Sequence, residues 1–91
     1  MNGGAEIGFD WDEANRKHLA AHQVTPAEFE QVMHSDPVDI GMELIGGEER
    51  YRSVGMTVRG RLLTVVWTMR AGKLRAVTVV SSSVWVSGLI T

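Results

Sequence analysis

Two histidines and an asparagine near the start of the chain have the spacing of one helix face. Asn15, His18 and His22 stand at positions i, i+3 and i+7, which a helix would place on the same side. Imidazole is well suited to accept and return a proton near neutral pH. Such a face suits cleavage of an RNA phosphodiester, in which a base takes the 2′-hydroxyl proton and an acid protonates the leaving oxygen. The alternative is structural: both histidines would only close the helix or bond to backbone carbonyls.

Arginines later in the sequence supply the positive charge that this cleavage requires. Arg50 and Arg52 alternate on one predicted strand, Arg75 begins another, and guanidinium groups can bind phosphate oxygens in pairs. Tyr51, between the first two arginines, is the aromatic residue that could stack on a base. Lys17, in the first predicted helix, is a further candidate for RNA contact. Each of these arginines could equally be an ordinary solvent-facing strand residue.

The charges of the chain divide sharply between its two halves. Residues 1–49 contain all eleven acids with only Arg16 and Lys17 as strong bases, a net charge of −9. Residues 50–91 contain seven Lys and Arg and no acid, and the whole chain is at −2. A one-sided basic half can attract phosphate locally even when the net charge is negative. The alternative is that the two halves neutralise each other within one fold.

The sequence gives little support for a metal or an organic cofactor. His18 and His22 have the i, i+4 spacing of a zinc pair, but the Glu that follows the first His in zinc proteases is absent and no third ligand is evident. The chain has no Cys, so it has neither disulfides nor thiolate chemistry. It also lacks a Gly-rich phosphate loop and a serine nucleophile motif. We therefore expect no metal and no cofactor.

Two helices are predicted to carry the first group of candidates. Residues 13–22 contain no Gly, Pro or β-branched residue, and Asp10 or Asp12 could cap the helix that they form. Thr25 and Glu28 have the spacing of a capping box with Pro26 in the first turn, which predicts a second helix to about His34. A short strand at residues 6–11 is expected to precede both helices.

Strands are predicted for the rest of the chain, at residues 38–45, 50–57, 61–69 and 74–80. The first of them alternates, with four apolar residues expected on one face: Val38, Ile40, Met42 and Leu44. Trp67 is in phase with Leu63 and Val65, which predicts a core position. The order is β-α-α-β-β-β-β, an α+β fold with a mostly antiparallel sheet and both helices packed on one face.

The length of 91 residues predicts a single domain, to which we assign residues 1–80. Residues 81–91, SSSVWVSGLIT, form an uncharged tail that could extend the last strand, cross to a partner or be disordered. The N-terminal residues lack the apolar region of a signal peptide, and the longest apolar run is too short to span a bilayer. We therefore expect a cytoplasmic protein that does not associate with membranes.

The ordered set of motifs resembles a known family. The run FDWDEANRKHLAAHQVTPAEFEQVMHSDPV resembles the opening of BrnT-type toxins, with an aromatic–Trp–Asp strand, an Asn-x-x-His-x-x-x-His helix and a Thr-Pro helix start. The later stretch GGEERYRSVGMTVRGRLLTVVWTMRAGKLRAVT continues it with an Arg-Tyr strand, a Gly-Arg-Leu-Leu turn and a final Arg-x-Val-Thr strand. The resemblance covers about residues 7–78.

This resemblance implies an endoribonuclease toxin of a type II toxin–antitoxin pair with a RelE-like fold. Such toxins cleave RNA without a metal and are neutralised by an antitoxin that also binds DNA. By motif position, His18 and His22 match the paired histidines, Arg50 matches the Arg-Tyr strand, and Arg75 matches the basic residue entering the last strand. The expected catalytic residues are therefore His18, His22 and Arg50, with Lys17 and the residues Tyr51, Arg52 and Arg75 contacting RNA.

The C-terminus departs from the family pattern. The family usually has an Arg shortly after the last-strand Ser/Thr, followed by a charged helix, whereas this chain has Val79, Val80 and the uncharged tail. Loss of one charge-stabilising group elsewhere lowers the rate by about two or three orders of magnitude. The alternative function is therefore a catalytically inactive toxin-like protein that only binds an antitoxin or forms homo-oligomers through its tail.

Overall fold

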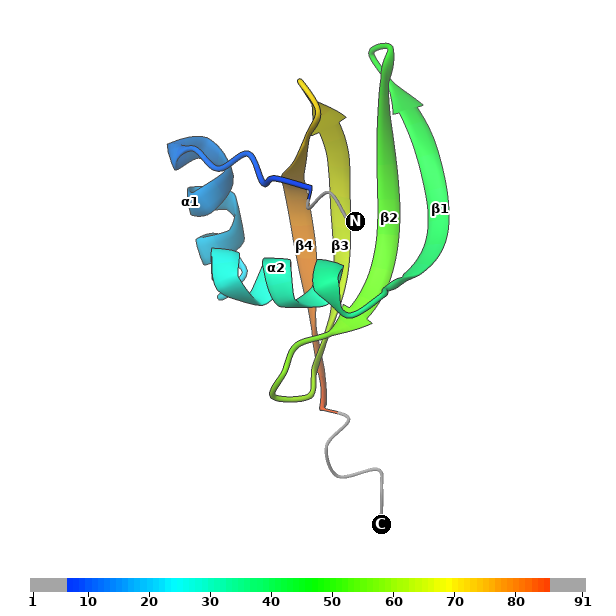
Figure 1. Cartoon of the computed structure of the whole chain (residues 1–91). Coiled ribbons are helices and arrows are strands. Elements are labelled where there is room, and N and C mark those ends of the chain that lie inside the picture. The colour runs from blue at the N-terminus through cyan, green and yellow to red at the C-terminus, as the bar shows by residue number, and fades with distance from the viewer. Residues whose placement is uncertain (1–6, 86–91) are drawn as a thin grey trace, which may run out of the picture.

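The computed structural model describes residues 7–85, in which two helices precede a four-stranded sheet (Figure 1). The elements are α1 (Glu13–Ala21), α2 (Pro26–His34), β1 (Val38–Ile45), β2 (Glu48–Met56), β3 (Arg61–Arg70) and β4 (Lys73–Trp85). The strands lie in the order β1-β2-β3-β4, and each pair of neighbours is antiparallel. The predicted α+β class and the predicted hairpins are confirmed.

Both helices begin with a reciprocal capping box. At α2, the hydroxyl of Thr25 accepts the backbone N–H of Glu28 at 3.1 Å, and the Glu28 carboxylate accepts the N–H of Thr25 at 3.0 Å, as the sequence predicts. At α1, Asp12 is the cap and exchanges two bonds of 2.9 Å with Asn15. Each box satisfies backbone donors that have no partner inside the helix.

The predicted first strand is reduced to a single bridge. Phe9 pairs in parallel with Leu74, and two backbone bonds of 2.9 Å tie Gly8 and Asp10 to that residue. Of the short strand predicted over residues 6–11, the described positions thus keep only the bridge at Phe9. The bridge cannot continue into a longer strand because Asp12, two residues after Asp10, is already the N-cap of α1.

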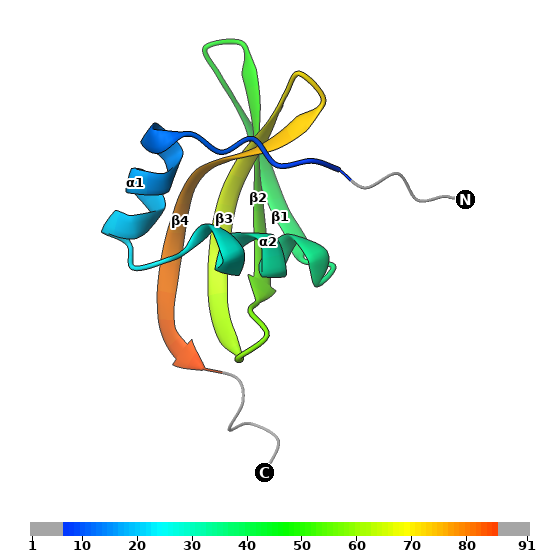
Figure 2. The ribbon, with the colours of Figure 1, turned by 60° about the vertical axis from the view of Figure 1, so that its left-hand side comes forward.

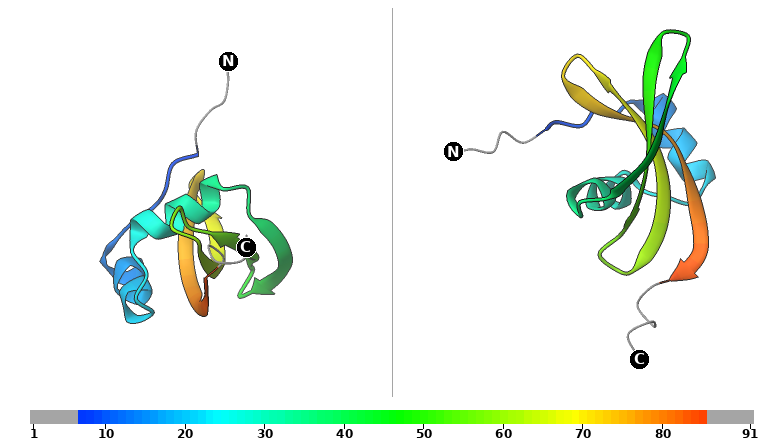
Figure 3. Two further views of the ribbon diagram at one scale, coloured as in Figure 1. Left: turned by 90° about the horizontal axis from the view of Figure 1, so that it is seen from below. Right: turned by 90° about the vertical axis from the view of Figure 1, so that its right-hand side faces the viewer.

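The two helices contact different strands of the sheet but contribute to the same core. Figures 2 and 3 show α2 lying across one face of the sheet, whereas α1 lies beside β4, at the edge opposite β1. Side chains from both helices, from the connection between them and from β3 and β4 form one apolar core: Leu19, Val24, Phe29, Val32, Leu63, Val65, Leu74, Ala76 and Val79. Trp67 is half-buried and packs against this core, in agreement with its predicted position.

One close approach joins α2 to the sheet. A Cβ at Gly55 of β2 would lie 2.8 Å from a methyl carbon of Val32 and 3.1 Å from the Cβ of Pro37. Only glycine therefore lets the end of α2 rest directly on the strand.

The strand β1 differs from the prediction of one apolar face. The register shifts between Asp39 and Gly41, so that Val38 lies opposite Val54 whereas Met42 lies opposite Tyr51. Val54 and Tyr51 are on opposite faces of β2 because successive strand residues alternate. The bulge thus divides the expected apolar row between two faces. All eight residues of β1 are exposed, so this edge strand adds nothing to the core.

The last strand is longer than predicted. β4 continues to Trp85, which pairs with Arg61, so the backbone of residues 81–85 extends the sheet. For residues 81–85, this confirms the prediction that the tail could extend the last strand. Residues 86–91 lie outside the described part of the chain. None of the helices in the described range is long and apolar enough to span a membrane.

Candidate active site

A small polar cavity of about 250 Å³ lies between α1 and the sheet. Its polar lining consists of Asn15, His18, Glu48, Arg50, Thr68, Arg70 and Arg75. These residues come from α1, β2, β3 and β4, so that segments distant in the sequence meet at one place. The structure therefore brings together one predicted histidine with Arg50 and Arg75, and it adds Arg70.

Strand alternation determines which residues reach this cavity. Arg50 and Thr68 line it, whereas their neighbours Tyr51 and Trp67 line a second cavity together with Met33 of α2. Tyr51 and Trp67 are paired across β2 and β3, and their rings are stacked with centroids 4.6 Å apart. The polar cavity lined by Arg50, Arg70 and Arg75, which we call the arginine cavity, is therefore on the face of the sheet opposite α2. The predicted RNA contact Tyr51 lies on the other face.

Arg75 is held by two carboxylates at the start of α1. Its Nη2 lies 2.8 Å from Oδ2 of Asp12, and its Nη1 lies 3.5 Å from Oδ2 of Asp10. The side chain is 13% exposed, and its Nη1 forms no hydrogen bond with any group of residues 7–85. This nitrogen is itself buried, so the charge of Arg75 is balanced mainly by the neighbouring acids Asp10 and Asp12.

The carboxylate that holds Arg75 also caps the histidine helix. The backbone N–H of Asn15 lowers the pKa of Asp12 below its ordinary value, and the hydrogen bond and charge of Arg75 lower the same pKa further against a partial desolvation. Both groups favour the charged carboxylate. Asp12 therefore links the position of α1, which carries His18, to the position of Arg75.

Arg50 and Arg70 complete the positive lining. Arg50 donates from Nε to Glu48 at 2.9 Å, and about a third of each side chain is exposed. Arg70 is exposed and pairs with no carboxylate of the described chain. The sequence interpretation missed Arg70, because only the register of β2, β3 and β4 places the end of β3 beside Arg50 and Arg75.

The histidine face predicted for α1 divides into separate roles. His18 is exposed and lines the cavity, whereas His22 is the C-cap residue of α1 and is absent from the cavity lining. Their ring centroids are 6.0 Å apart. Asn15 is buried, and its amide is bound to the backbone of Asp12 and, at 2.8 Å, of Asp10. Its observed contacts are those of a helix cap.

The two remaining candidates lie outside the cavity. Arg52 is exposed farther along β2 and forms an ion pair of 3.1 Å with Glu43. Lys17 lines a different surface hollow, together with Trp11 and Arg16. Within residues 7–85, no three His, Asp or Glu side chains are grouped so that they could hold a metal ion. Of the seven predicted site residues, the structure thus gathers His18, Arg50 and Arg75.

Comparison with protein-family models matches residues 11–82 to the family described as "Ribonuclease toxin, BrnT, of type II toxin-antitoxin system". Comparisons with curated proteins and with solved structures found no match. The matched range contains the whole cavity, both helices and most of the sheet. It confirms the resemblance found in the sequence, and it implies an RNA substrate and an antitoxin partner. The chain belongs to the BrnT family of ribonuclease toxins of type II toxin–antitoxin systems.

Proposed function

We propose that the chain is a metal-independent endoribonuclease that acts by acid–base chemistry in the arginine cavity. The observation that carries this proposal is the convergence of His18, Arg50, Arg70 and Arg75 on one space of about 250 Å³. A proton-transfer group and several fixed positive charges in one cavity are the parts that phosphodiester cleavage requires. We also infer that the protein acts in the cytoplasm, where it would meet RNA.

In the proposed reaction, His18 accepts the 2′-hydroxyl proton of the RNA. The 2′ oxygen forms a bond to phosphorus, the bond to the 5′ oxygen breaks, and the products are a 2′,3′-cyclic phosphate and a 5′-hydroxyl end. The guanidinium groups balance the negative charge that develops on the phosphate oxygens. The departing 5′ oxygen takes a proton from the solvent that reaches this open cavity. His22 lies beside His18 but does not line the cavity, so we expect it to contribute less to the cleavage rate.

Substitution of His18 tests the role of this side chain. His18→Ala should lower the RNA cleavage rate about 10²–10⁴-fold, which is the usual contribution of a general base. His22→Ala should have a smaller effect. The matched control is His34→Ala, because His34 is also exposed near a helix end but lines the other cavity. Equal rates for the His18 and His34 variants would contradict the assignment.

The need for a metal is tested with the same assay. Because arginines provide the positive charge in the proposed reaction, turnover of a labelled RNA should continue in EDTA and should not rise when magnesium is added. The alternative, an inactive toxin-like protein, predicts no turnover by the parent chain. Against that alternative, neither Val79 nor Val80, where the family pattern has an Arg, lines the cavity.

A further inference from the structure

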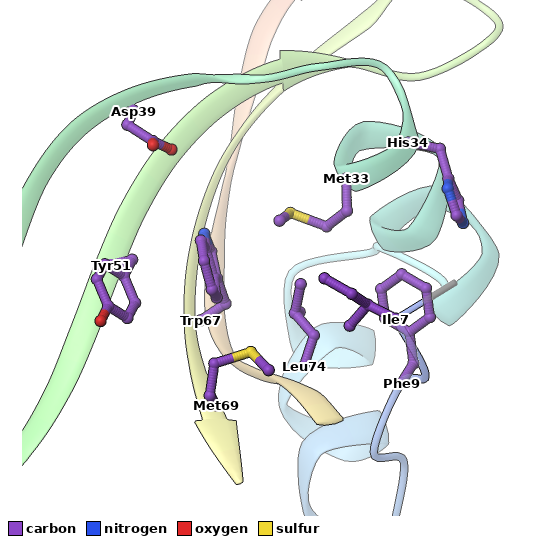
Figure 4. Close-up of a pocket in the computed structure, with 9 residues that line it drawn as sticks. All are labelled: Ile7, Phe9, Met33, His34, Asp39, Tyr51, Trp67, Met69 and Leu74. Carbon is purple, nitrogen blue, oxygen red and sulfur yellow. The ribbon is translucent and has the colours of Figure 1, made fainter. Parts of the chain in front are cut away.

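The face of the sheet that carries α2 has a hollow of about 670 Å³ that the proposed reaction does not use (Figure 4). Its walls come from the N-terminal segment, the end of α2 and strands β1 to β4. The apolar lining consists of Ile7, Phe9, Met33, Trp67, Met69 and Leu74. Figure 4 shows these side chains on either side of an open space, with Asp39 and Tyr51 on the strand side.

The hollow continues toward the β1–β2 hairpin. An adjacent hollow of about 470 Å³ shares Tyr51 and Met69 with the first one and adds Leu44 of β1. We call the two hollows together the partner groove. Three of its apolar side chains are exposed, Leu44 by 67%, Ile7 by 54% and Met69 by 44%, whereas Phe9, Met33 and Trp67 are half-buried and Leu74 is buried. Contiguous exposed apolar surface of this kind marks an interaction site more often than a free surface.

Its strand wall is fixed by a chain of hydrogen bonds. The indole N–H of Trp67 donates to the hydroxyl of Ser53 at 3.0 Å, and that hydroxyl donates to Asp39 at 2.7 Å. Tyr51 donates to Glu49 at 2.7 Å. The polar ends of Trp67 and Tyr51 and the carboxylates of Asp39 and Glu49 are therefore held in place before a partner arrives, which lowers the entropy lost on binding.

The charge of the partner groove indicates the kind of partner. Asp39 and Glu49 are the lining acids without an Arg or Lys partner in the described chain, whereas Glu48, at the rim shared with the arginine cavity, is paired with Arg50; the lining includes no Lys or Arg. An RNA phosphate would be repelled here, and it is attracted to the arginines on the opposite face instead. A second copy docked by the same groove would bring like charges together, because a two-fold interface pairs a surface with itself. A partner with Lys or Arg beside its apolar side chains fits best.

We propose that the partner groove receives an apolar segment flanked by Lys or Arg, supplied by the antitoxin. This inference rests on the toxin function, because it assigns the antitoxin a place on the toxin. The segment would insert apolar side chains between Phe9, Trp67 and Met69, while its basic side chains meet Asp39 and Glu49. The larger hollow shares no lining residue with the arginine cavity, whereas the smaller hollow meets that cavity at Glu48 and Thr68.

The experiment measures binding of the full chain to the purified protein encoded by the adjacent open reading frame, by calorimetry. The double variant Leu44→Ser/Met69→Ser should weaken the affinity at least tenfold. The matched control is Val58→Ser/Val80→Ser, because Val58 is 80% exposed and Val80 is 59% exposed, and neither lines the partner groove. Val58 also lies in the β2–β3 connection, at the far end of the sheet (Figure 1). This control should stay within twofold of the parent affinity.

A charge pair of variants tests the second half of the proposal. Glu49→Gln should weaken binding and make it less dependent on salt, because one attraction to the basic partner is lost. Glu13→Gln, on the exposed surface of α1, should change neither quantity. Equal effects of the two substitutions would overturn the assignment of a basic partner.

The outcomes separate this inference from the proposed reaction. RNA cleavage by all of these variants should equal that of the parent, because none of the substituted residues lies in the catalytic lining. A double variant that cleaves RNA and binds the partner with parent affinity overturns the groove assignment alone. A parent chain that does not bind the partner also overturns the groove assignment. The assignment is likewise overturned if light scattering shows that the parent chain is a dimer and that the double variant is a monomer, because the groove would then bind a second copy. A parent that binds but cannot cleave RNA removes only the proposed reaction, and the affinity comparison still decides the groove.

Discussion

At the scale of single residues, Asp12 has more than one structural role. It caps α1 through Asn15, and it binds the guanidinium of Arg75 at 2.8 Å. One carboxylate thus sets the position of the helix that carries His18 and the orientation of a cavity arginine. In the proposed reaction, such a residue would position His18 and Arg75 without contacting the substrate itself.

Asp12→Asn separates these two roles, because Asn is also a good helix cap but carries no charge. The variant should keep the helix and lower the cleavage rate about ten- to a hundredfold, since small displacements of catalytic groups have effects of this size. Asp12→Glu, which restores the charge, should recover part of the rate. Circular dichroism checks the helix, and a rate at the parent level would contradict a positioning role.

The same carboxylate gives a stability signal in acid. The pKa of Asp12 is lowered in the folded state from 3.8, so its contribution to the free energy of unfolding is present above that value and is lost as the pH falls through the lower folded value. Urea unfolding of the parent between pH 5 and pH 2 should show this loss, and Asp12→Asn should lack that component.

At the scale of elements, the contact between α2 and β2 depends on the absence of a side chain at Gly55. Gly55→Ala would place a Cβ 2.8 Å from Val32 and 3.1 Å from Pro37, and should lower the free energy of unfolding by about 1–3 kcal/mol, as overpacking does. Gly41→Ala is the matched control: it lies in β1 and its Cβ would have no neighbour within 4 Å. Urea unfolding of both variants measures the difference, and similar stabilities would contradict the packing argument.

The exposed edge strand is the second informative element. β1 has no residue in the core, and its outer backbone edge pairs with no other strand among the described residues. The bulge after Asp39 turns Met42 and Leu44 toward the side of Tyr51 and the partner groove. A bulge also discourages pairing of such an edge with a second sheet. The strand thus adds to an interaction surface while adding little to the core.

At the scale of the whole molecule, the divided charge has two consequences. Four of the seven bases in residues 50–91 form ion pairs, in every case with acids of residues 1–49. Arg61 is the most enclosed example, since its Nη1 contacts Glu28 at 3.1 Å and its Nη2 contacts Ser81 at 2.6 Å. Mutual neutralisation of the halves is therefore confirmed in part. The remaining positive charge includes Arg70, at the cavity.

Salt dependence tests the electrostatic role of that cavity. In a His18→Ala background, RNA affinity should fall with rising salt, and Arg70→Ala should reduce the slope of log affinity against log salt by about one, as expected for one lost phosphate contact. Arg59→Ala, which removes an exposed base outside the cavity lining, is the control and should leave the slope unchanged. Equal slopes for parent and Arg70→Ala would remove Arg70 from the RNA-binding surface.

Local chemistry made several features of this protein predictable from sequence. The helix start at Thr25 follows from reciprocal bonds between residues three apart, and the antiparallel hairpins follow from short connections between β-prone runs. The order of the motifs in the sequence also indicates the BrnT family, and the family match over residues 11–82 confirms that resemblance. The helix that carries His18 and the strands that carry Arg50 and Arg75 belong to this predictable part.

Only the tertiary structure decided which of those residues meet. The bulge in β1 divided an apparently regular apolar row, because a register shift of one residue reverses every later side chain. The pairing of β2 with β3 and β4 placed Arg70 beside Arg50 and Arg75, and it put Tyr51 on the opposite face. The sequence alone determined the elements and the family. The assignment of residues to a cavity or to the partner groove required the register, which depends on contacts between distant segments.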